Sequence, residues 1–207
     1  MLAAVTPMPR ALFLFLLLGC TLSLRAAPPP PAPPASARAR ELIKSLQLEY
    51  LPGESGYFGL LGRSTQTVVR NGRELAAQSR IYYLLTAETP LNYLHWLDSD
   101  DTHVLLEGGP VDYFIFHPDG HVEQVTLGRD AAAGQKLVVA IPGGCAKALR
   151  LHPGAEYVLL ANVLSPEWTP DRVKVGAGAD FLRRYGHRAP WATEAALREL
   201  IGPNFHD

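Results

Sequence analysis

The sequence predicts an all-β domain, an antiparallel sandwich or barrel, with a short helix before it and one or two helices after it. The first observation is a series of ten short β-rich segments, bounded by Gly, Pro, Asn and Asp at close intervals. The second is a pair of connections that carry hairpin turn residues, and the third is the lack of any helical pattern between the segments. Short strands without alternating helices indicate an antiparallel sandwich or barrel.

The composition is that of one globular domain. The chain has 207 residues, of which 47% are apolar and 19% charged, and no stretch in its middle resembles a linker between two folded halves. The formal net charge is −1, and there is no basic stripe, zinc-finger spacing or RNA-binding signature. Nucleic acid is therefore not expected as a partner.

The first 27 residues have the layout of a secretory signal peptide. Arg10 precedes an apolar run from Ala11 to Leu18, and Ala26 and Ala27 offer a cleavage site. The run is shorter than the roughly 20 apolar residues of a membrane span. We therefore expect a secreted or secretory-pathway protein with no stable membrane insertion after cleavage. A signal-anchored form, and a lipid-anchored form through Cys20 in a lipobox-like sequence, are the alternatives.

A proline-rich linker follows over residues 28–38. Six of the seven residues from Pro28 to Pro34 are proline, a composition that favours extended polyproline II and predicts a stiff spacer. Once the signal is removed, Cys145 is the remaining cysteine of the sequence and no intramolecular disulfide can form. Cys145 follows two glycines, and the sequence is consistent with both a small half-buried residue and a reactive thiol at this position.

The barrel is expected over residues 39–175. The spacing of apolar residues predicts a short amphipathic helix within Ala39–Tyr50, at the edge of the domain. Hairpin turns are expected at Asn71-Gly72, which supplies positive φ angles, and at His117–His121, which contains Pro and Asp-Gly. The predicted strands are Gly56–Leu61, Thr65–Val69, Ile81–Thr86, Leu91–Leu97, His103–Leu106, Val111–Phe116, Val122–Leu127, Leu137–Ile141, Ala146–Leu151 and Tyr157–Leu164.

Residues 176–207 are expected to form a helical C-terminal extension. Helical patterns cover Ala179–Tyr185 and Thr193–Ile201. The second helix begins just after Pro190-Trp191 and ends at Gly202-Pro203, because Gly and Pro commonly follow the last helical turn.

Several of these segments together resemble a cupin subfamily that is known chiefly as a domain of unknown function. The resemblance rests on Leu42–Leu48 followed by Pro52–Phe58, on Ile81–Thr86, on His95 with Ser99–His103, and on Gly109-Pro110, Pro118–Gly120 and Pro142–Gly144. Their order and spacing hold over some 130 residues. The resemblance implies a double-stranded β-helix, the cupin or jelly-roll barrel, which is often dimeric. It implies little about activity.

The same resemblance points to a degenerate metal site. Metal-binding cupins are similar to one another in two motifs, whose four ligand positions fall here on His95, Leu97, Asp101 and Lys147. Only His95 and Asp101 could bind a metal ion, whereas a divalent transition metal needs three or four protein donors. The standard cupin metal site is therefore expected to be lost, and the cofactor is unknown.

A second arrangement could still bind a metal ion. Residues two apart in a strand share a face, so Asp101 and His103 lie together, and His95 on a neighbouring strand could complete a three-ligand site of the non-haem iron kind. The alternative is an Asp–His pair that is satisfied by its own hydrogen bond on a half-buried sheet, and we favour this alternative.

Binding of a small molecule is the leading function. The barrel mouth would hold a small polar or anionic ligand, either carbohydrate-like or an organic acid. The expected ligand-binding residues are His95, Asp101, His103, Lys147 and Tyr57, and Lys147 would attract an anionic group. A lysine that points into solvent is the other interpretation of Lys147.

The alternative function is that of a cupin enzyme, related to epimerases and isomerases or to metal-dependent oxygenases. His95 or His103 would act as the base, Asp101 would orient it, and Tyr57 or Tyr83 would act as the acid.

Two expectations concern packing. Trp96 points to the face opposite His95, and it should therefore pack outside the barrel against a helix or a partner subunit. A homodimer is expected because pairing would cover apolar strands such as Tyr113–Phe116.

Overall fold

The structure is a computed structural model that describes residues 31–207. The predicted signal peptide, Cys20 and the first residues of the proline-rich linker lie outside this range. Export, cleavage and lipid anchoring therefore stay predictions. Within residues 31–207, none of the helices has the length and apolar character needed to span a bilayer.

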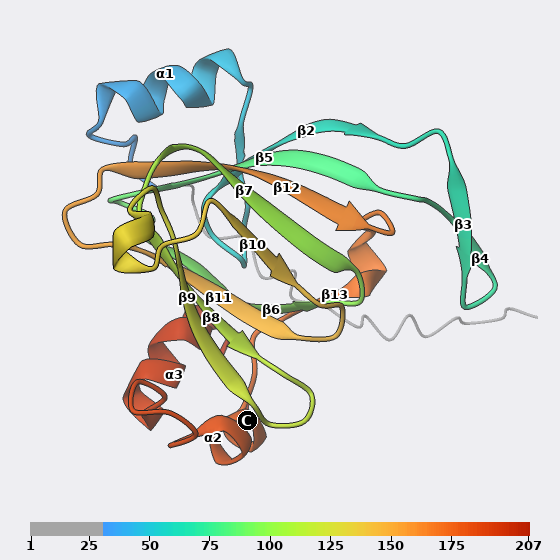
Figure 1. Ribbon diagram of the computed structural model, residues 1–207, viewed down its shortest axis with the longest axis vertical. Helices are drawn as coiled ribbons and strands as arrows, with labels where there is room; N and C mark the ends of the chain where they lie inside the picture. Colours follow the sequence, from blue (N-terminus) through green and yellow to red (C-terminus); the bar gives the residue numbers. More distant parts are fainter. Residues whose placement is uncertain (1–30) are drawn as a thin grey trace, which may run out of the picture.

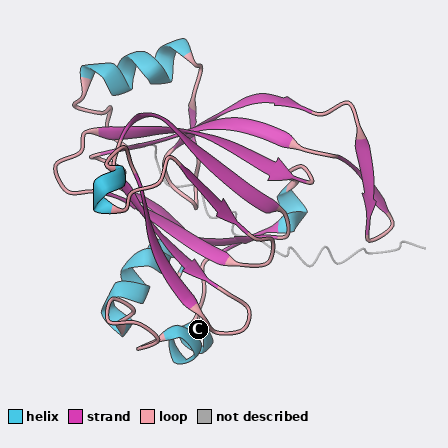
Figure 2. Ribbon diagram, in the orientation of Figure 1, coloured by secondary structure: helices cyan, strands magenta, loops and turns pink. Residues whose placement is uncertain are grey.

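Two antiparallel sheets face each other and form the barrel (Figure 1, Figure 2). One has six strands in the order β1-β2-β5-β12-β7-β10, and the other has five in the order β13-β6-β11-β8-β9. The all-β jelly-roll fold class is thereby confirmed. The strands are β1 (Glu49–Tyr50), β2 (Tyr57–Arg63), β3 (Thr67–Arg70), β4 (Arg73–Ala76), β5 (Ser79–Thr86), β6 (Leu91–Leu97), β7 (Asp100–Gly108), β8 (Val111–Phe116), β9 (Val122–Leu127), β10 (Val138–Ile141), β11 (Ala146–Leu151), β12 (Tyr157–Ser165) and β13 (Val173–Val175).

Every predicted strand is present, with ends that differ by a few residues at most. The three strands that the pattern missed are β1, β4 and β13, which have two to four residues each. Such short segments carry too little alternation to be recognised alone. The Asn71-Gly72 turn joins β3 to β4 with positive φ at both residues, as predicted. This hairpin projects from the body of the barrel (Figure 1).

The helices cover the outside of the two sheets. α1 (Ala37–Ser45) starts at Ser36, whose hydroxyl accepts a hydrogen bond from the Ala39 N–H. The helix predicted within Ala39–Tyr50 is present but ends at Ser45, and Glu49-Tyr50 pairs with β2. α2 (Ala179–Tyr185) and α3 (Glu194–Ile201) were predicted within a residue, and Thr193 caps α3.

Apolar side chains from α2 and α3 pack on the outer face of the five-stranded sheet. Trp96 lies there in edge-to-face contact with Phe181, which confirms the prediction that it packs outside the barrel against a helix. Tyr113–Phe116 is at most 5% exposed in the single chain. The reason given for a dimer was therefore wrong, because α2, α3 and the barrel core already cover this strand. Dimerisation itself stays a prediction.

Candidate functional site

A cavity of about 190 Å³ lies between the two sheets. Its wall is mostly apolar, and its polar residues come from both sheets and from the loop that precedes β2. The apolar lining residues are Leu51, Phe58, Leu60, Ile81, Leu97, Leu164 and Trp168, and the polar ones are Glu54, Arg63, Ser79, Tyr83, Asn92, His95, Asp101, His103, Lys147 and Asn162. A few polar groups converging in an apolar concavity are typical of a small-molecule site.

Strand register places the polar groups in two facing sets. On the five-stranded sheet, Lys147 of β11 is opposite His95 of β6. On the six-stranded sheet, His103 of β7 is opposite Asn162 of β12. Asp101 shares the face of His103 because alternate residues of a strand point the same way. The two sets meet across the interior of the barrel.

A buried ion pair joins the two sheets. Lys147 Nζ lies 2.8 Å from Asp101 Oδ2, and both side chains are at most 3% exposed. Burial raises the pKa of the Asp101 carboxyl, but His103 and the Lys147 ammonium outweigh this effect and hold the pKa well below its usual range. The interpretation of Lys147 as a solvent-pointing lysine is wrong, and its charge is already balanced by Asp101.

His103 is held at both ring nitrogens. Its Nε2 lies 2.8 Å from Asp101 Oδ2 and its Nδ1 lies 2.8 Å from the Tyr113 hydroxyl. Burial raises the pKa of Tyr113 well above its ordinary value, so its hydroxyl keeps its proton and can donate to Nδ1. Nε2 then carries the ring proton and donates it to the carboxylate. The Asp–His pair satisfied by its own hydrogen bond, which we favoured from the sequence, is the arrangement present.

Asn162 completes this network. Its amide Nδ2 lies 2.6 Å from His103 Nε2, and its Oδ1 is buried without a partner. Because the two ends of an amide exchange by a half-turn, the oxygen fits beside a ring N–H better than the NH₂ group does. As placed, Asn162 Oδ1 lacks a protein partner, and so does Asp101 Oδ1.

His95 differs from His103 in having one ring nitrogen free for chemistry. Its Nδ1–H donates to the Tyr93 carbonyl at 2.8 Å, which leaves the lone pair on Nε2. Nε2 lies 3.5 Å from Glu54 Oε2. Burial lowers the pKa of His95; the Glu54 carboxylate opposes this shift and the Lys147 ammonium adds to it. His95 is therefore a neutral imidazole near pH 7.

The two tyrosines that were candidate acids have different surroundings. Tyr83 lines the cavity, but its hydroxyl donates to the Ser55 carbonyl at 2.6 Å, and burial raises its pKa well above the usual value. A side chain on Gly56 would collide with that hydroxyl, which explains a glycine there. Tyr57 packs under α1 with Leu42 and Leu48, outside the cavity. The structure corrects its expected ligand-binding role, because Phe58 occupies the inward position.

The residues of the cavity do not fit a metal ion. All four positions of the cupin motifs, His95, Leu97, Asp101 and Lys147, line this cavity. Leu97 has no donor atom and Lys147 is an ammonium paired to Asp101. Both nitrogens of His103 are engaged. The donors of His95, Asp101 and His103 do not converge within 4.8 Å of one another, whereas within residues 31–207 those of His117, His121 and Glu123 do.

Sequence reasoning missed Asn162, Tyr113 and Glu54 as members of the site. Asn162 had a usable signal, because an amide within the nearly all-apolar segment Leu160–Leu164 needs a buried polar partner. Tyr113 and Glu54 had none, since Tyr113 contacts His103 from a strand of the opposite sheet and Glu54 contacts His95 from the loop before β2, and no strand period connects either pair.

Comparisons with known proteins agree with this architecture. A family model described as "Cupin superfamily (DUF985)" matches residues 40–175. "Uncharacterized protein YML079W" of Saccharomyces cerevisiae is 33% identical over 106 residues, which are 50% of this chain and 50% of that protein. The chain thus matches about half the length of this curated relative.

Two solved structures are similar over most of their length. A hypothetical protein from Leishmania major has 25% sequence identity and a TM-score of 0.68, covering 78% of this chain and 97% of its own. Protein SO0799 from Shewanella oneidensis has 24% identity and the same TM-score of 0.68, covering 79% of this chain and 96% of its own, and its likeness concerns the fold. The family match extends over most of the chain and coincides with the barrel, so the chain belongs to the cupin superfamily, in the family described as DUF985.

Proposed function

We propose that this protein binds a small, hydroxyl-bearing or amine-bearing molecule in the barrel cavity, without a metal ion. The observation that carries the proposal is the pair of unsatisfied polar atoms at the polar end of the cavity, on Asp101 and Asn162. A buried carboxylate oxygen without a partner costs free energy unless a donor reaches it, and a ligand hydroxyl or amine would supply that donor.

The charge balance favours a neutral ligand over an anion. Lys147 is paired to Asp101 at 2.8 Å, and Arg63 is paired to Glu167 at 3.1 Å. Glu54 adds a carboxylate to the lining. An organic acid would thus meet two cations that already have partners and two carboxylates that would repel it. Among the ligands expected from the sequence, the carbohydrate-like class is the one that this lining suits.

Size and wall chemistry narrow the class further. Pockets for drug-sized ligands have volumes of roughly 300–1,000 Å³, whereas this cavity has about 190 Å³. Phe58, Ile81 and Leu164 offer an apolar wall beside the polar end. A molecule of at most one sugar ring, with polar hydrogens at one end and an apolar face, is the best match.

A binding screen with matched variants tests this proposal. Thermal unfolding is measured with neutral polyols and monosaccharides such as inositol and fucose, and with malate and citrate. We expect at least one neutral compound to raise the melting temperature and the acids to have no effect. Asn162→Leu should remove that shift, and the exposed Gln124→Leu should keep it. Shifts by the acids alone, or an equal shift in Asn162→Leu, would contradict the proposal.

A second candidate function is proton transfer by His95. The neutral imidazole has a fixed tautomer and a free Nε2, as a general base requires. His103, the other base considered, has no free nitrogen. Incubation of the bound compound in heavy water tests this function by mass spectrometry. Deuterium incorporation that His95→Gln abolishes supports catalysis, and no incorporation leaves binding as the function.

A further inference from the structure

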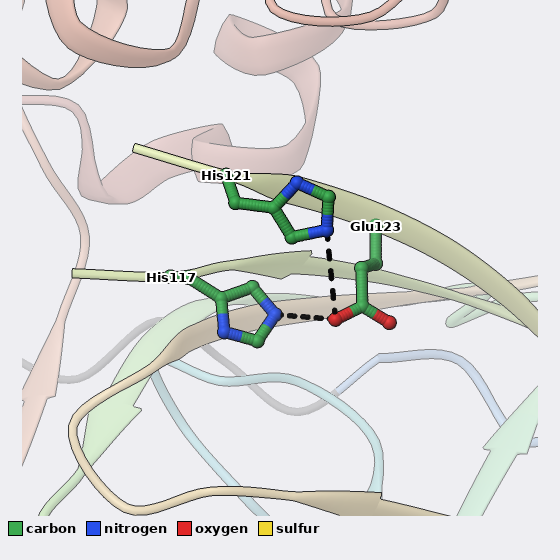
Figure 3. A group of neighbouring side chains, drawn as sticks. All are labelled: His117, His121 and Glu123. Carbon is green, nitrogen blue, oxygen red and sulfur yellow. Dashed lines mark hydrogen bonds and ion pairs between the residues drawn. The ribbon is translucent and has the colours of Figure 1, made fainter. Parts of the chain in front are cut away.

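A second group of histidine and carboxylate side chains lies at the tip of the β8–β9 hairpin, outside the barrel cavity (Figure 3). The turn is fixed by three hydrogen bonds. The His117 N–H donates to the His121 carbonyl at 2.9 Å, and the Gly120 N–H donates to the His117 carbonyl at 3.0 Å. The Asp119 carboxylate accepts from the His121 N–H at 2.9 Å. The two histidines are thus held opposite each other.

Strand geometry brings a carboxylate to the same face. Glu123 follows His121 by two residues, so the two side chains point the same way, and Glu123 is a diagonal neighbour of His117 across the hairpin. Glu123 Oε1 lies 2.5 Å from His117 Nε2 and 3.8 Å from His121 Nε2. In Figure 3 both imidazoles turn one nitrogen toward that single oxygen.

The rest of the structure supports His117 in this position. Cys145 Sγ lies 3.4 Å from His117 Nδ1. With Nε2 on a metal ion, Nδ1–H would donate to the sulfur, and a partner on the second ring nitrogen is typical of metal-bound histidine. The Tyr185 hydroxyl donates to the His117 carbonyl at 2.8 Å, which ties the turn to α2.

We propose that His117, His121 and Glu123 form a binding site for a divalent transition metal ion, with zinc as the best match. Two imidazoles and one carboxylate are a common zinc donor set, and a water molecule can take the fourth position. Their donor atoms lie within 4.8 Å of one another, and inward movements of the exposed His121 and Glu123 side chains would bring them to about 2 Å from a shared ion. This site is independent of the function proposed for the cavity.

The chain contains a matched comparison for a histidine that is paired without such convergence. His152, just after β11, has its Nε2 2.9 Å from Asp112 Oδ2, and both side chains are partly exposed. This pair does not belong to a three-donor group within residues 31–207. If zinc binds to any surface imidazole, His152→Ala should weaken binding as much as His121→Ala does. If zinc binds at the hairpin, only His121→Ala should weaken binding.

Calorimetric titration of the untagged, chelator-treated chain with zinc chloride tests the proposal. We expect one ion per wild-type chain, unchanged binding by His152→Ala, and at least about tenfold weaker binding by His121→Ala and by Glu123→Gln. His121 has 61% of its side chain exposed, so its replacement should leave the fold intact, and circular dichroism checks this. Zinc at about a hundred times its dissociation constant should raise the melting temperature of the wild type by roughly 5 to 10 °C.

Two outcomes would overturn the site. One is the absence of stoichiometric zinc binding by the wild type near pH 7.5. The other is equal zinc affinity of His121→Ala and the wild type. Both outcomes are expected if His117 and Glu123 only share a proton in a hydrogen bond and no metal ion binds there. Because metal competes with protons for imidazole, binding should also weaken as the pH is lowered.

Discussion

The barrel cavity contains two histidines and two carboxylates, and the tip of the β8–β9 hairpin contains two histidines and one carboxylate, but the two regions use them differently. In the cavity, the donor atoms of Asp101 and His103 are taken up by Lys147 and Tyr113. At the hairpin, the two imidazoles and Glu123 face one another at a partly exposed surface. The same residue types therefore give a buried and largely paired network in one place, with Asp101 Oδ1 and His95 Nε2 left over, and a partly exposed donor set in the other.

Burial, more than residue type, therefore determines whether the donor atoms of a His–carboxylate group stay available to a metal ion. A buried charge must be paired within the protein, and the side chains of Asp101 and His103 are accordingly paired with residues from several strands. Those partners consume the lone pairs that a metal ion would need. A surface group has water as its partner and can keep its donors available.

The largest effect should come from breaking the buried pair. Lys147→Met leaves Asp101 charged, buried and without its cation, and we expect the free energy of unfolding to fall by about 3–5 kcal/mol. Lys174→Met on β13 is the control, because Lys174 is exposed, and it should change stability by less than about 0.5 kcal/mol. Urea unfolding measures both. Equal values for the two variants would mean that the pair is not important for stability.

The pH dependence of stability should be intermediate in size. The folded-state pKa of His95 is lowered by burial, so the unfolded chain takes up that proton more readily. The contribution of neutral His95 to the free energy of unfolding is present above the unfolded pKa of about 6.5. This contribution is lost as the pH falls below that value. The wild type should thus lose more stability than His95→Gln between pH 7.5 and 5. Parallel pH profiles would show that His95 is not buried as a neutral base.

The Asp101 carboxyl also makes the folded state less stable as the pH falls, but at lower pH than His95. Its pKa is also lowered in the folded state, so its contribution is lost only below the unfolded value of about 3.9. The pH ranges in which His95 and Asp101 lose their contributions to stability can be distinguished by measuring the free energy of unfolding over one series of decreasing pH.

The smallest effect on stability should come from the hairpin. Without metal, His121→Ala removes an exposed side chain and should change the free energy of unfolding by less than about 0.5 kcal/mol. With zinc present, the wild type should become more stable than this variant. A loss above 1 kcal/mol without metal would show that the hairpin group is a structural ion pair, and would remove the contrast with the cavity.

Much of the fold could be predicted from the sequence, because it depends on neighbours in the chain. The alternation of apolar residues located every long strand, and the turn residues at Asn71-Gly72 and His117–His121 located two hairpins. The common face of Asp101 and His103 also followed from the pattern, and the cupin resemblance added His95 to the expected site. The two-residue period of a strand determines which side chains share a face.

Only the tertiary structure decided the chemistry of the cavity. His103 meets Asn162 from a strand that lies 59 positions away, and the Lys147 ammonium reaches Asp101 from the opposite sheet. Strand order and sheet packing set these contacts, and neither is encoded by a local period. The barrel and the replacement of cupin metal ligands by Leu97 and Lys147 could be inferred from residue order and the family resemblance alone. The tertiary structure determined which donors stay free, because a hydrogen bond depends on distance in space and not on spacing along the chain.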